Sequence, residues 1–414
     1  MRPAHLFSVI AGSAATKQFL CLPLMRVLLA FDKFKDSLTA PAACEAAARA
    51  LRATHPAWSL DLCPLADGGE GFCEILTRAA GGVVESHTVT GPRGAPTAAT
   101  LGFVALEKIP AAARALLGIE NPKSKIQNSA ARVAIIEMAS ASGLALLAQD
   151  HRDPWQTSTT GTGELMRLAG ARGVAAILLG VGGSATHDLG LGALAALGLK
   201  FEDCGGSAIV PPIPALWPGV VRVSGAVPPL PPVRIACDVN NPLTGPRGAA
   251  ATYGPQKGLR AADLTRLDSE SARLATLLCA HSGKPAALMD TPGAGAAGGI
   301  SFGLMVAAGA HLVPGTDLVS AWLDVEAKLA AADLVITGEG RFDDSSLQGK
   351  GPGAIAARAL ALGKKVHVFA GRATVAHPPA NLALHSITPV GVPLDRALRE
   401  TAEFLEKSVR QYLS

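Results

Sequence analysis

A serine, a histidine and an aspartate stand close together in residues 178–190, LLGVGGSATHDLG. Ser184, His187 and Asp188 lie within five positions of one another, after an apolar run and among glycines. A hydrolytic triad needs side chains that converge from separate elements, and the GxSxG pattern of a nucleophile elbow is absent. The glycine run instead suits a loop between a strand and a helix, whose N–H groups can approach an anion. The simpler alternative is a tight turn capped by Asp188 or Thr186.

Carboxylates follow strand-like or glycine-rich segments at four other places. They are Asp32 with Lys35, Asp67 beside Gly68 and Gly69, Asp238 after VRIAC, and Glu339, Arg341 and Asp343 after DLVITG. Magnesium takes one or two carboxylates and leaves its other positions to water and phosphate oxygens, so this set suits a metal and a phosphate. Taken alone, Asp32 beside Lys35 is equally consistent with a surface ion pair.

Two glycine motifs resemble known nucleotide-binding motifs, but the residues around them do not match what those motifs need. PGAGAAGG matches GxGxxG, yet Pro292 and the polar MDT precede it, where a dinucleotide fold needs a buried strand. An NAD-dependent oxidoreductase of a small hydroxy acid is therefore the weaker alternative. Around Lys350, Asp344 stands where a Walker loop needs glycine and Gly351 where it needs serine or threonine. The chain has no P-loop.

Composition narrows the class of protein. The 414 residues include 49% hydrophobic and 17% charged side chains, with 37 basic and 33 acidic residues and a net charge of +4. Basic and acidic residues alternate, which argues against a nucleic-acid partner, and no apolar run is long enough to span a membrane. Seven cysteines form no CxxC pair, which fits reduced thiols rather than disulfides or structural zinc. We expect a soluble cytoplasmic protein with a small-molecule partner.

Apolar runs alternate with helix-length segments, which predicts an α/β fold with parallel sheets. We expect strands at 26–31, 131–139, 175–181, 233–239, 333–339 and 365–371. Residues 83–106 alternate around TGPRGAP, which predicts a hairpin, and residues 107–130 resemble a surface insertion. Residues 1–24 carry two basic residues and no acid before a second methionine, Met25. We interpret them as a disordered extension or a mis-set start rather than a targeting presequence.

Nine blocks, in order, resemble the bacterial glycerate kinase family. They are AFDKFKDSLTA, PLADGGEG, EMASASGL, TTGTGEL, GVGGSATHDLG, ACDVNNPL, YGPQKG, PGAGAAGG and DLVITGEGRFD. The resemblance implies a discontinuous Rossmann-like or flavodoxin-like domain with a second α/β domain inserted and the active site in the cleft between them. We place the first domain at 25–85 and 295–414 and the inserted domain at 86–294.

The resemblance also implies a reaction, in which ATP and Mg²⁺ serve to phosphorylate D-glycerate, usually to 2-phosphoglycerate. In our hypothesis Asp188 accepts the proton of the attacking hydroxyl, Lys35 stabilises the transferred phosphoryl group, and Asp32 organises the acceptor or the metal. We assign metal binding to Asp238 and Asp343, and binding of ATP to Gly182, Gly183, Gly293, Gly295 and Glu339. Substrate binding falls to Ser184, His187, Arg341, Asp67, Gly68 and Gly69.

The chain departs from the family pattern near this predicted site. The family typically reads APDSFKGS where this chain has Phe31, Lys33 and Asp36, and SATNDGG where it has His187 and Leu189. The acceptor is accordingly less firmly predicted than the reaction class. A related sugar acid, 3-phosphoglycerate as product, and a silent ligand-binding protein stay open, as does a homodimer.

Overall fold

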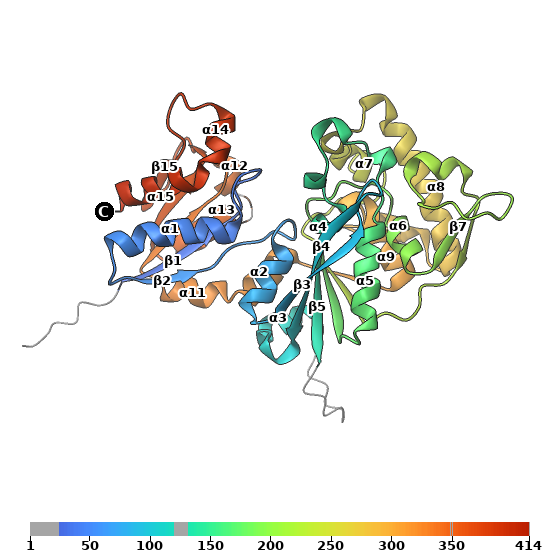
Figure 1. The fold of residues 1–414 in the computed structure, drawn as a ribbon, viewed down its shortest axis with the longest axis horizontal. Helices are drawn as coiled ribbons and strands as arrows, with labels where there is room; N and C mark the ends of the chain where they lie inside the picture. The colour runs from blue at the N-terminus through green and yellow to red at the C-terminus, as the bar shows by residue number, and fades with distance from the viewer. Residues whose placement is uncertain (1–24, 120–130, 348, 350, 414) are drawn as a thin grey trace, which may run out of the picture.

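The computed structural model describes residues 25–119, 131–347, 349 and 351–413 of the 414-residue chain. It has two lobes, each built on its own sheet (Figure 1). The expected N-terminal extension, and most of the expected insertion's second half, lie outside these residues. None of the described helices is both long and apolar enough to cross a membrane.

The first lobe is a five-stranded parallel sheet with strand order β15-β13-β11-β1-β2. Its strands are β1 (Arg26–Phe31), β2 (Ser59–Leu62), β11 (Leu334–Gly338), β13 (Lys365–Ala370) and β15 (Leu382–Ser386). Its helices are α1 (Ala40–Thr54), α11 (Val325–Ala331), α12 (Asp344–Leu347), α13 (Pro352–Ala361), α14 (Leu394–Arg399) and α15 (Thr401–Tyr412). A small parallel pair, β12 (Arg341–Asp343) and β14 (Arg372–Thr374), extends this lobe.

Alternate residues of β1 face opposite layers of the first lobe. Val27, Leu29 and Phe31 belong to a core that includes α1 and α15, whereas Leu28 and Ala30 belong to a core that includes α11 and α13. Both faces of the strand are buried, which explains its uninterrupted apolar sequence. Thr39 caps α1, because its hydroxyl accepts a hydrogen bond from the Ala42 N–H.

The second lobe contains a mixed sheet with strand order β10-β9-β6-β5-β4-β3. Its strands are β3 (Val83–Thr90), β4 (Pro96–Ala105), β5 (Arg132–Glu137), β6 (Ala176–Gly180), β9 (Val233–Ala236) and β10 (His311–Val313). The antiparallel pair of β3 and β4 confirms the predicted hairpin. A separate antiparallel pair consists of β7 (Leu199–Glu202) and β8 (Arg222–Gly225).

Helices cover both faces of this second sheet. One layer shares a core with the first lobe and contains α2 (Phe72–Ala79), α3 (Ala111–Leu117) and α10 (Gly315–Trp322). The other helices are α4 (Met138–Ser142), α5 (Thr160–Ala171), α6 (Leu191–Ala196), α7 (Ala249–Tyr253), α8 (Leu264–Ser282) and α9 (Ala296–Ala308). The hydrophobic core that contains Leu28 of β1 also contains Phe72 of α2 and Ile135 of β5, so it runs between the lobes.

The α/β class and the discontinuous first lobe agree with the expectation, but the boundaries between the lobes differ from the predicted ones. Helix α2 lies against β3, β4 and β5, and β10 pairs with β9, so residues 72–85 and 295–322 belong to the second lobe. The predicted boundaries at 85/86 and 294/295 are therefore wrong. The apolar pattern of α9 and the three residues of β10 do not reveal which sheet they join, because that choice depends on tertiary contacts.

Candidate active site

A cavity of about 840 Å³ lies between the lobes, at the carboxyl ends of strands from both sheets. Segments that follow β1, β5, β6 and β9 line it, together with the connection between β2 and α2. Ligands of open α/β sheets bind at the carboxyl ends of strands. The position and volume suit a small-molecule site.

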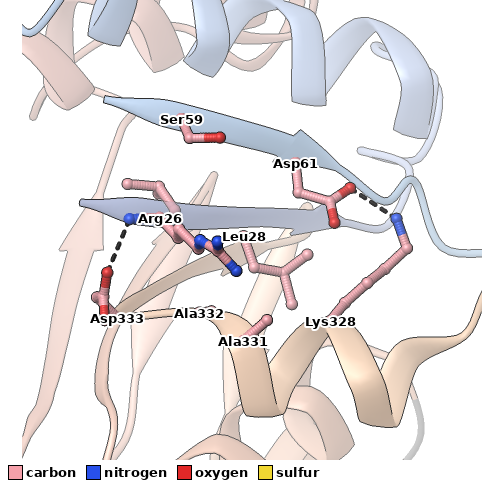
Figure 2. A pocket seen from close by; sticks show the side chains of 9 residues that line it. Arg26, Leu28, Ser59, Asp61, Lys328, Ala331, Ala332 and Asp333 are labelled. Carbon is pink, nitrogen blue, oxygen red and sulfur yellow. Dashed lines mark hydrogen bonds and ion pairs between the residues drawn. The ribbon is translucent and has the colours of Figure 1, made fainter. Parts of the chain in front are cut away.

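A second cavity, of about 640 Å³, lies at the opposite end of the first sheet (Figure 2). It is bordered by the first residues of β1 and β2 and by α11, and an ion pair at 2.6 Å joins Lys328 Nζ to Asp61 Oδ1. Arg26 N–H donates to Asp333 Oδ2 at 2.8 Å. These are the amino ends of the strands, and none of the predicted site residues lies there, so the cavity between the lobes is the candidate site.

Asp32 directly precedes Lys33, which lines this cavity from the first lobe. The Asp32 N–H donates to Gly338 O of β11 at 3.0 Å, which fixes this aspartate directly after β1. Burial, and then the charge of Asp67, raises the pKa of the Asp32 carboxyl to about 6. Lys35, three residues on, lines the cavity itself. The structure thus brings both predicted residues to the carboxyl end of β1.

Lys33 links the first lobe to the connection that leads into α2. Its Nζ lies 3.3 Å from Asp67 Oδ1 and 3.1 Å from Glu70 Oε2. Burial opposes the charge of this lysine, but Asp67, Asp32 and Glu70 together raise its pKa above the ordinary value. Sequence reasoning missed Lys33 as a site residue and noted it only as a departure from the family pattern.

The predicted loops Asp67–Gly69 and Gly182–Gly183 pack directly on each other. Gly182 N–H donates to Gly68 O at 2.9 Å, and a Cβ at Gly182 would lie 2.6 Å from Gly69 N. Gly68 has a φ of +86°, a conformation that glycine adopts without strain. Here the glycines allow two backbones to meet, while Asp67, Gly182 and Gly183 still line the cavity.

Glu137, the last residue of β5, also lines the cavity and was missed. Its Oε2 accepts hydrogen bonds from the N–H groups of Gly71 (3.0 Å) and Cys73 (3.2 Å), at the start of α2. Burial raises the pKa of this carboxyl to about 7, with the charge of Glu70 adding to the effect. The signal was available, because Glu137 ends an apolar run as Asp32 and Glu339 do.

Asp188 does not reach the cavity. Its carboxylate is fully buried and accepts hydrogen bonds from Thr159 N–H (2.7 Å), Thr159 Oγ1 (2.9 Å), Gly192 N–H (3.1 Å) and Gly190 N–H (3.1 Å). It therefore joins α5 to the start of α6. A proton acceptor must lie within hydrogen-bond reach of its substrate, so this geometry does not support Asp188 as the general base.

Ser184 does line the cavity, and the fully buried Lys257 holds it in place. Lys257 Nζ donates to Ser184 Oγ at 2.8 Å and to Thr186 O at 2.7 Å. Burial lowers the pKa of this lysine to about 7, opposed by the charge of Asp188. Lys257 was missed, although it lies in the quoted block YGPQKG.

His187 is also fully buried, and its Nε2 lies 3.0 Å from Ser271 Oγ of α8. Burial, with the charge of Lys257, lowers the pKa of its ring to about 3. The ring is therefore neutral near pH 7. Its predicted role in substrate binding is not supported, because it does not line the cavity.

Gly293 and Gly295 serve the packing of a neighbouring loop instead of facing the cavity. Both N–H groups donate to Asn241 O, at 3.2 and 3.0 Å. The segment before them is the 3₁₀ turn Ala286–Asp290, not a strand. Farther on, Gly298 O accepts from the Leu189 N–H at 3.0 Å, so PGAGAAGG buttresses the loop that carries Asp188. The predicted nucleotide contacts at Gly293 and Gly295 are not supported.

Glu339, Arg341 and Asp343 follow β11 on the first lobe. Burial raises the pKa of Glu339 to about 7, and the charges of Asp32 and Asp343 add to the effect. Arg341 is largely exposed, and its Nε lies 3.0 Å from Asp343 Oδ2. Arg341 and Asp343 do not line the cavity between the lobes, so the structure does not place Arg341 against a substrate there.

Asp238 lines the cavity from the second lobe, next to the first turn of α10. Its carboxylate accepts hydrogen bonds from Thr316 N–H at 2.9 and 3.0 Å and from Thr316 Oγ1 at 2.8 Å. Asp238 and Asp343 belong to different lobes. In the part of the chain that the structure describes, no group of three or more histidine, cysteine or acidic side chains is placed to hold a metal.

Comparison with known proteins identifies the family. The model of the glycerate kinase family matches residues 27–414. The glycerate kinase of Bacillus subtilis (strain 168) is 38% identical over 393 residues, covering 93% of this chain and 96% of that protein. The chain belongs to the glycerate kinase family. The glycerate 2-kinase of Escherichia coli (strain K12) is 36% identical over 388 residues, covering 91% and 93%.

A crystal structure assigned to glycerate kinase 2 from Salmonella typhimurium LT2 has the same fold. It superposes with a TM-score of 0.71 at 35% identity, covering 94% of this chain and 97% of that one. This likeness confirms the predicted α/β class over 94% of the chain. It also supports the discontinuous arrangement that the two sheets show.

Two departures from the glycerate kinase pattern fall on left-handed backbone positions. Asp36 has a φ of +60° and Leu189 a φ of +53°, where the family pattern has glycine. Side chains other than glycine are strained there, although aspartate tolerates the conformation better than leucine. Leu189 is fully buried in the core of the second lobe, whereas Asp36 is exposed. The strain at Leu189 is therefore offset by packing, which Asp36 lacks.

Proposed function

We propose that this chain transfers the γ-phosphoryl group of ATP to D-glycerate and releases 2-phosphoglycerate. The single observation that carries the proposal is the cavity between the lobes of a glycerate kinase fold, where acidic and basic side chains converge from both sheets. The name of the Escherichia coli relative, glycerate 2-kinase, supports position 2 as the site of phosphorylation.

The proton of the attacking hydroxyl needs an acceptor, and Asp32 is the better candidate. Its pKa of about 6 leaves the carboxylate mostly ionised at pH 7 and still basic enough to accept a proton. It lies at the carboxyl end of β1, whereas Asp188 is sealed by its hydrogen bonds. We therefore move the role of general base from Asp188 to Asp32.

Lys35 would stabilise charge on the transferred phosphoryl group. It lines the cavity three residues after Asp32. Phosphoryl transfer depends mainly on positioning and on neutralising the charge of the phosphate oxygens. A flexible ammonium group that follows the oxygens during transfer suits that task.

The residues present fit Mg²⁺ beside ATP. The pKa of Glu339 is raised to about 7 and that of Asp32 to about 6, and in both cases neighbouring carboxylates contribute. Crowded acids of this kind favour a cation, and one or two carboxylates are enough for magnesium that also binds phosphates. We propose that Glu339 and Asp343, which do not line the cavity but whose charges act together with that of Asp32 beside it, would hold the ion. When bound, the ion would neutralise charge on the phosphates. Asp238 is less suited, because Thr316 donates to both of its oxygens.

A coupled assay of ADP release tests the proposal. The purified chain is given Mg²⁺–ATP with D-glycerate, L-glycerate, hydroxypyruvate or larger sugar acids, and the acceptors are ranked by kcat/KM. We expect D-glycerate to rank first. ADP release with another acid but not with D-glycerate would contradict the substrate, and no ADP release with any acceptor would contradict the kinase. Titrating tryptophan fluorescence with NADH and ATP tests the oxidoreductase alternative.

A further inference from the structure

Arg152 lines the cavity from the second lobe. Its Nε is buried, and among the described residues it has no hydrogen-bond partner. No carboxylate of the described residues forms an ion pair with its guanidinium either. A buried guanidinium nitrogen without a partner is costly, because it has lost water and gained nothing. An anionic ligand in the cavity would supply the missing partner.

The neighbourhood of Arg152 supplies a second donor. Gly258 packs tightly on the Arg152 backbone, where a Cβ at Gly258 would lie 2.0 Å from Arg152 O. The adjacent Lys257 donates to Ser184 Oγ at 2.8 Å. In this contact Lys257 is the donor, so the Ser184 oxygen accepts and its own proton is left for another partner. Ser184 lines the same cavity as Arg152.

Other arginines near Arg152 already have partners of their own. Arg266 lies over the Trp155 ring at 4.7 Å, and Arg260 Nε forms an ion pair with Asp263 Oδ2 at 2.7 Å. Arg93 donates to His151 O at 3.2 Å and does not line the cavity. On the facing side of the cavity, Lys33 is neutralised by two carboxylates. Arg152 is thus the guanidinium in this wall that can receive an anionic ligand.

We propose that Arg152, with the Ser184 hydroxyl, binds the carboxylate of the acceptor and so determines specificity for an acid over a neutral alcohol. This inference rests on the function proposed above. The planar fork of an arginine matches a carboxylate with two parallel hydrogen bonds. A phosphate of ATP has the same oxyanion chemistry, but the acids that suit Mg²⁺ and phosphate follow β1 and β11 on the other lobe. The arginine that we first assigned to this task, Arg341, does not line the cavity.

The test compares Arg152→Gln and Arg152→Lys with the matched control Arg93→Gln. We measure kcat and the KM values of D-glycerate and ATP, and the affinity for D-glycerate without ATP by calorimetry. Arg152→Gln should weaken D-glycerate in both measurements by about 10- to 100-fold, the range of a lost charge-assisted pair. The KM of ATP should change less than about twofold. Arg152→Lys should recover part of the loss, and Arg93→Gln should behave as the wild type.

Further measurements distinguish a carboxylate of the acceptor at Arg152 from a phosphate of ATP. Glycerol lacks the carboxylate, so Arg152→Gln and the wild type should phosphorylate it equally poorly. Because only D-glycerate is affected, the ratio of kcat/KM for D-glycerate to that for glycerol should fall in the variant. A higher KM for ATP with unchanged D-glycerate affinity would overturn the assignment and place a phosphate at Arg152. Unchanged affinities for both ligands in a folded Arg152→Gln variant would overturn it as well. If the wild type phosphorylates no glycerate, the proposed function fails instead, which is a separate outcome.

Discussion

Two aspartates that looked alike in the sequence differ in their hydrogen-bond partners, although burial raises the pKa of both carboxyl groups. Asp32 follows β1 directly before Lys33, which lines the cavity, and burial raises the pKa of Asp32 to about 6. Asp188 lies in the glycine loop after β6, where four hydrogen bonds hold its fully buried carboxylate. Asp32 accepts a backbone hydrogen bond from Lys33 N–H at 2.7 Å, so fewer donors hold its carboxylate than hold that of Asp188, and more of its oxygen lone pairs are left for chemistry. The partners of the carboxylate, and not its position after a strand, separate the two roles.

We expect the largest effect on stability from a substitution of Asp188. In Asp188→Asn, an amide NH₂ would face donors that now meet a carboxylate oxygen, leaving buried N–H groups without acceptors. We expect a loss of about 3–5 kcal/mol in the free energy of unfolding, the range for breaking a buried charged network. Urea denaturation followed by circular dichroism measures it. A variant with wild-type stability but no turnover would restore Asp188 as the general base.

Asp32→Asn should show the opposite pattern. Loss of the proton acceptor should lower kcat by about 10²- to 10⁴-fold, while the unfolding midpoint stays level or rises. In the wild type, kcat/KM should fall as the pH drops through about 6, where Asp32 takes up its proton. Steady-state kinetics from pH 5 to 8 check both results. Retention of most activity in a folded Asp32→Asn variant would contradict the assignment.

The sign of the Asp32 effect on stability follows from its raised pKa. The folded chain binds this proton more tightly than the unfolded chain, whose aspartate titrates near 4. The free energy of unfolding therefore falls as the pH rises from about 4 to about 6 through this group, and is level above that window. Asn at position 32 removes this contribution, so the variant should gain relative to the wild type above pH 6.

We expect smaller effects on the free energy of unfolding at Leu189 and Asp36, the two positions with left-handed backbone where the family pattern has glycine. Leu189→Gly relieves backbone strain but removes a fully buried side chain, so we expect a net loss of about 2 kcal/mol. Asp36→Gly relieves strain at an exposed site and should gain about 0.5 kcal/mol. Denaturant titrations of both variants measure the difference. Equal effects of the same sign would show that strain and not burial dominates at these positions.

Much of the fold was predictable from the sequence. The strand at 26–31 and the hairpin at 83–106 agree with β1, β3 and β4, because period and turn residues are local signals. The boundaries between the lobes were wrong, since which sheet α2, α9 and β10 join depends on contacts between segments far apart in the chain.

The site was predictable only in part. The cavity is lined by Lys35, Asp67, Gly182, Gly183, Ser184 and Asp238, and Asp32 directly precedes Lys33, which also lines it. Asp188, His187, Gly293 and Gly295 are used for packing, which the pattern of residues does not reveal. Glu137 and Lys257 were missed although each lies in a quoted block. Arg152 carries no sequence signal, because what marks it is a buried nitrogen without a partner.

We propose that the chain phosphorylates D-glycerate in the cavity between the lobes. Phosphorus-31 NMR of a reaction containing Mg²⁺–ATP, D-glycerate and the purified chain tests it most directly, with Asp32→Asn run in parallel. We predict that the wild type forms 2-phosphoglycerate and ADP in equal amounts, and that the folded variant forms at least about 100-fold less per unit time. ADP that accumulates without a glycerate phosphoester, or equal product from both proteins, would contradict the account.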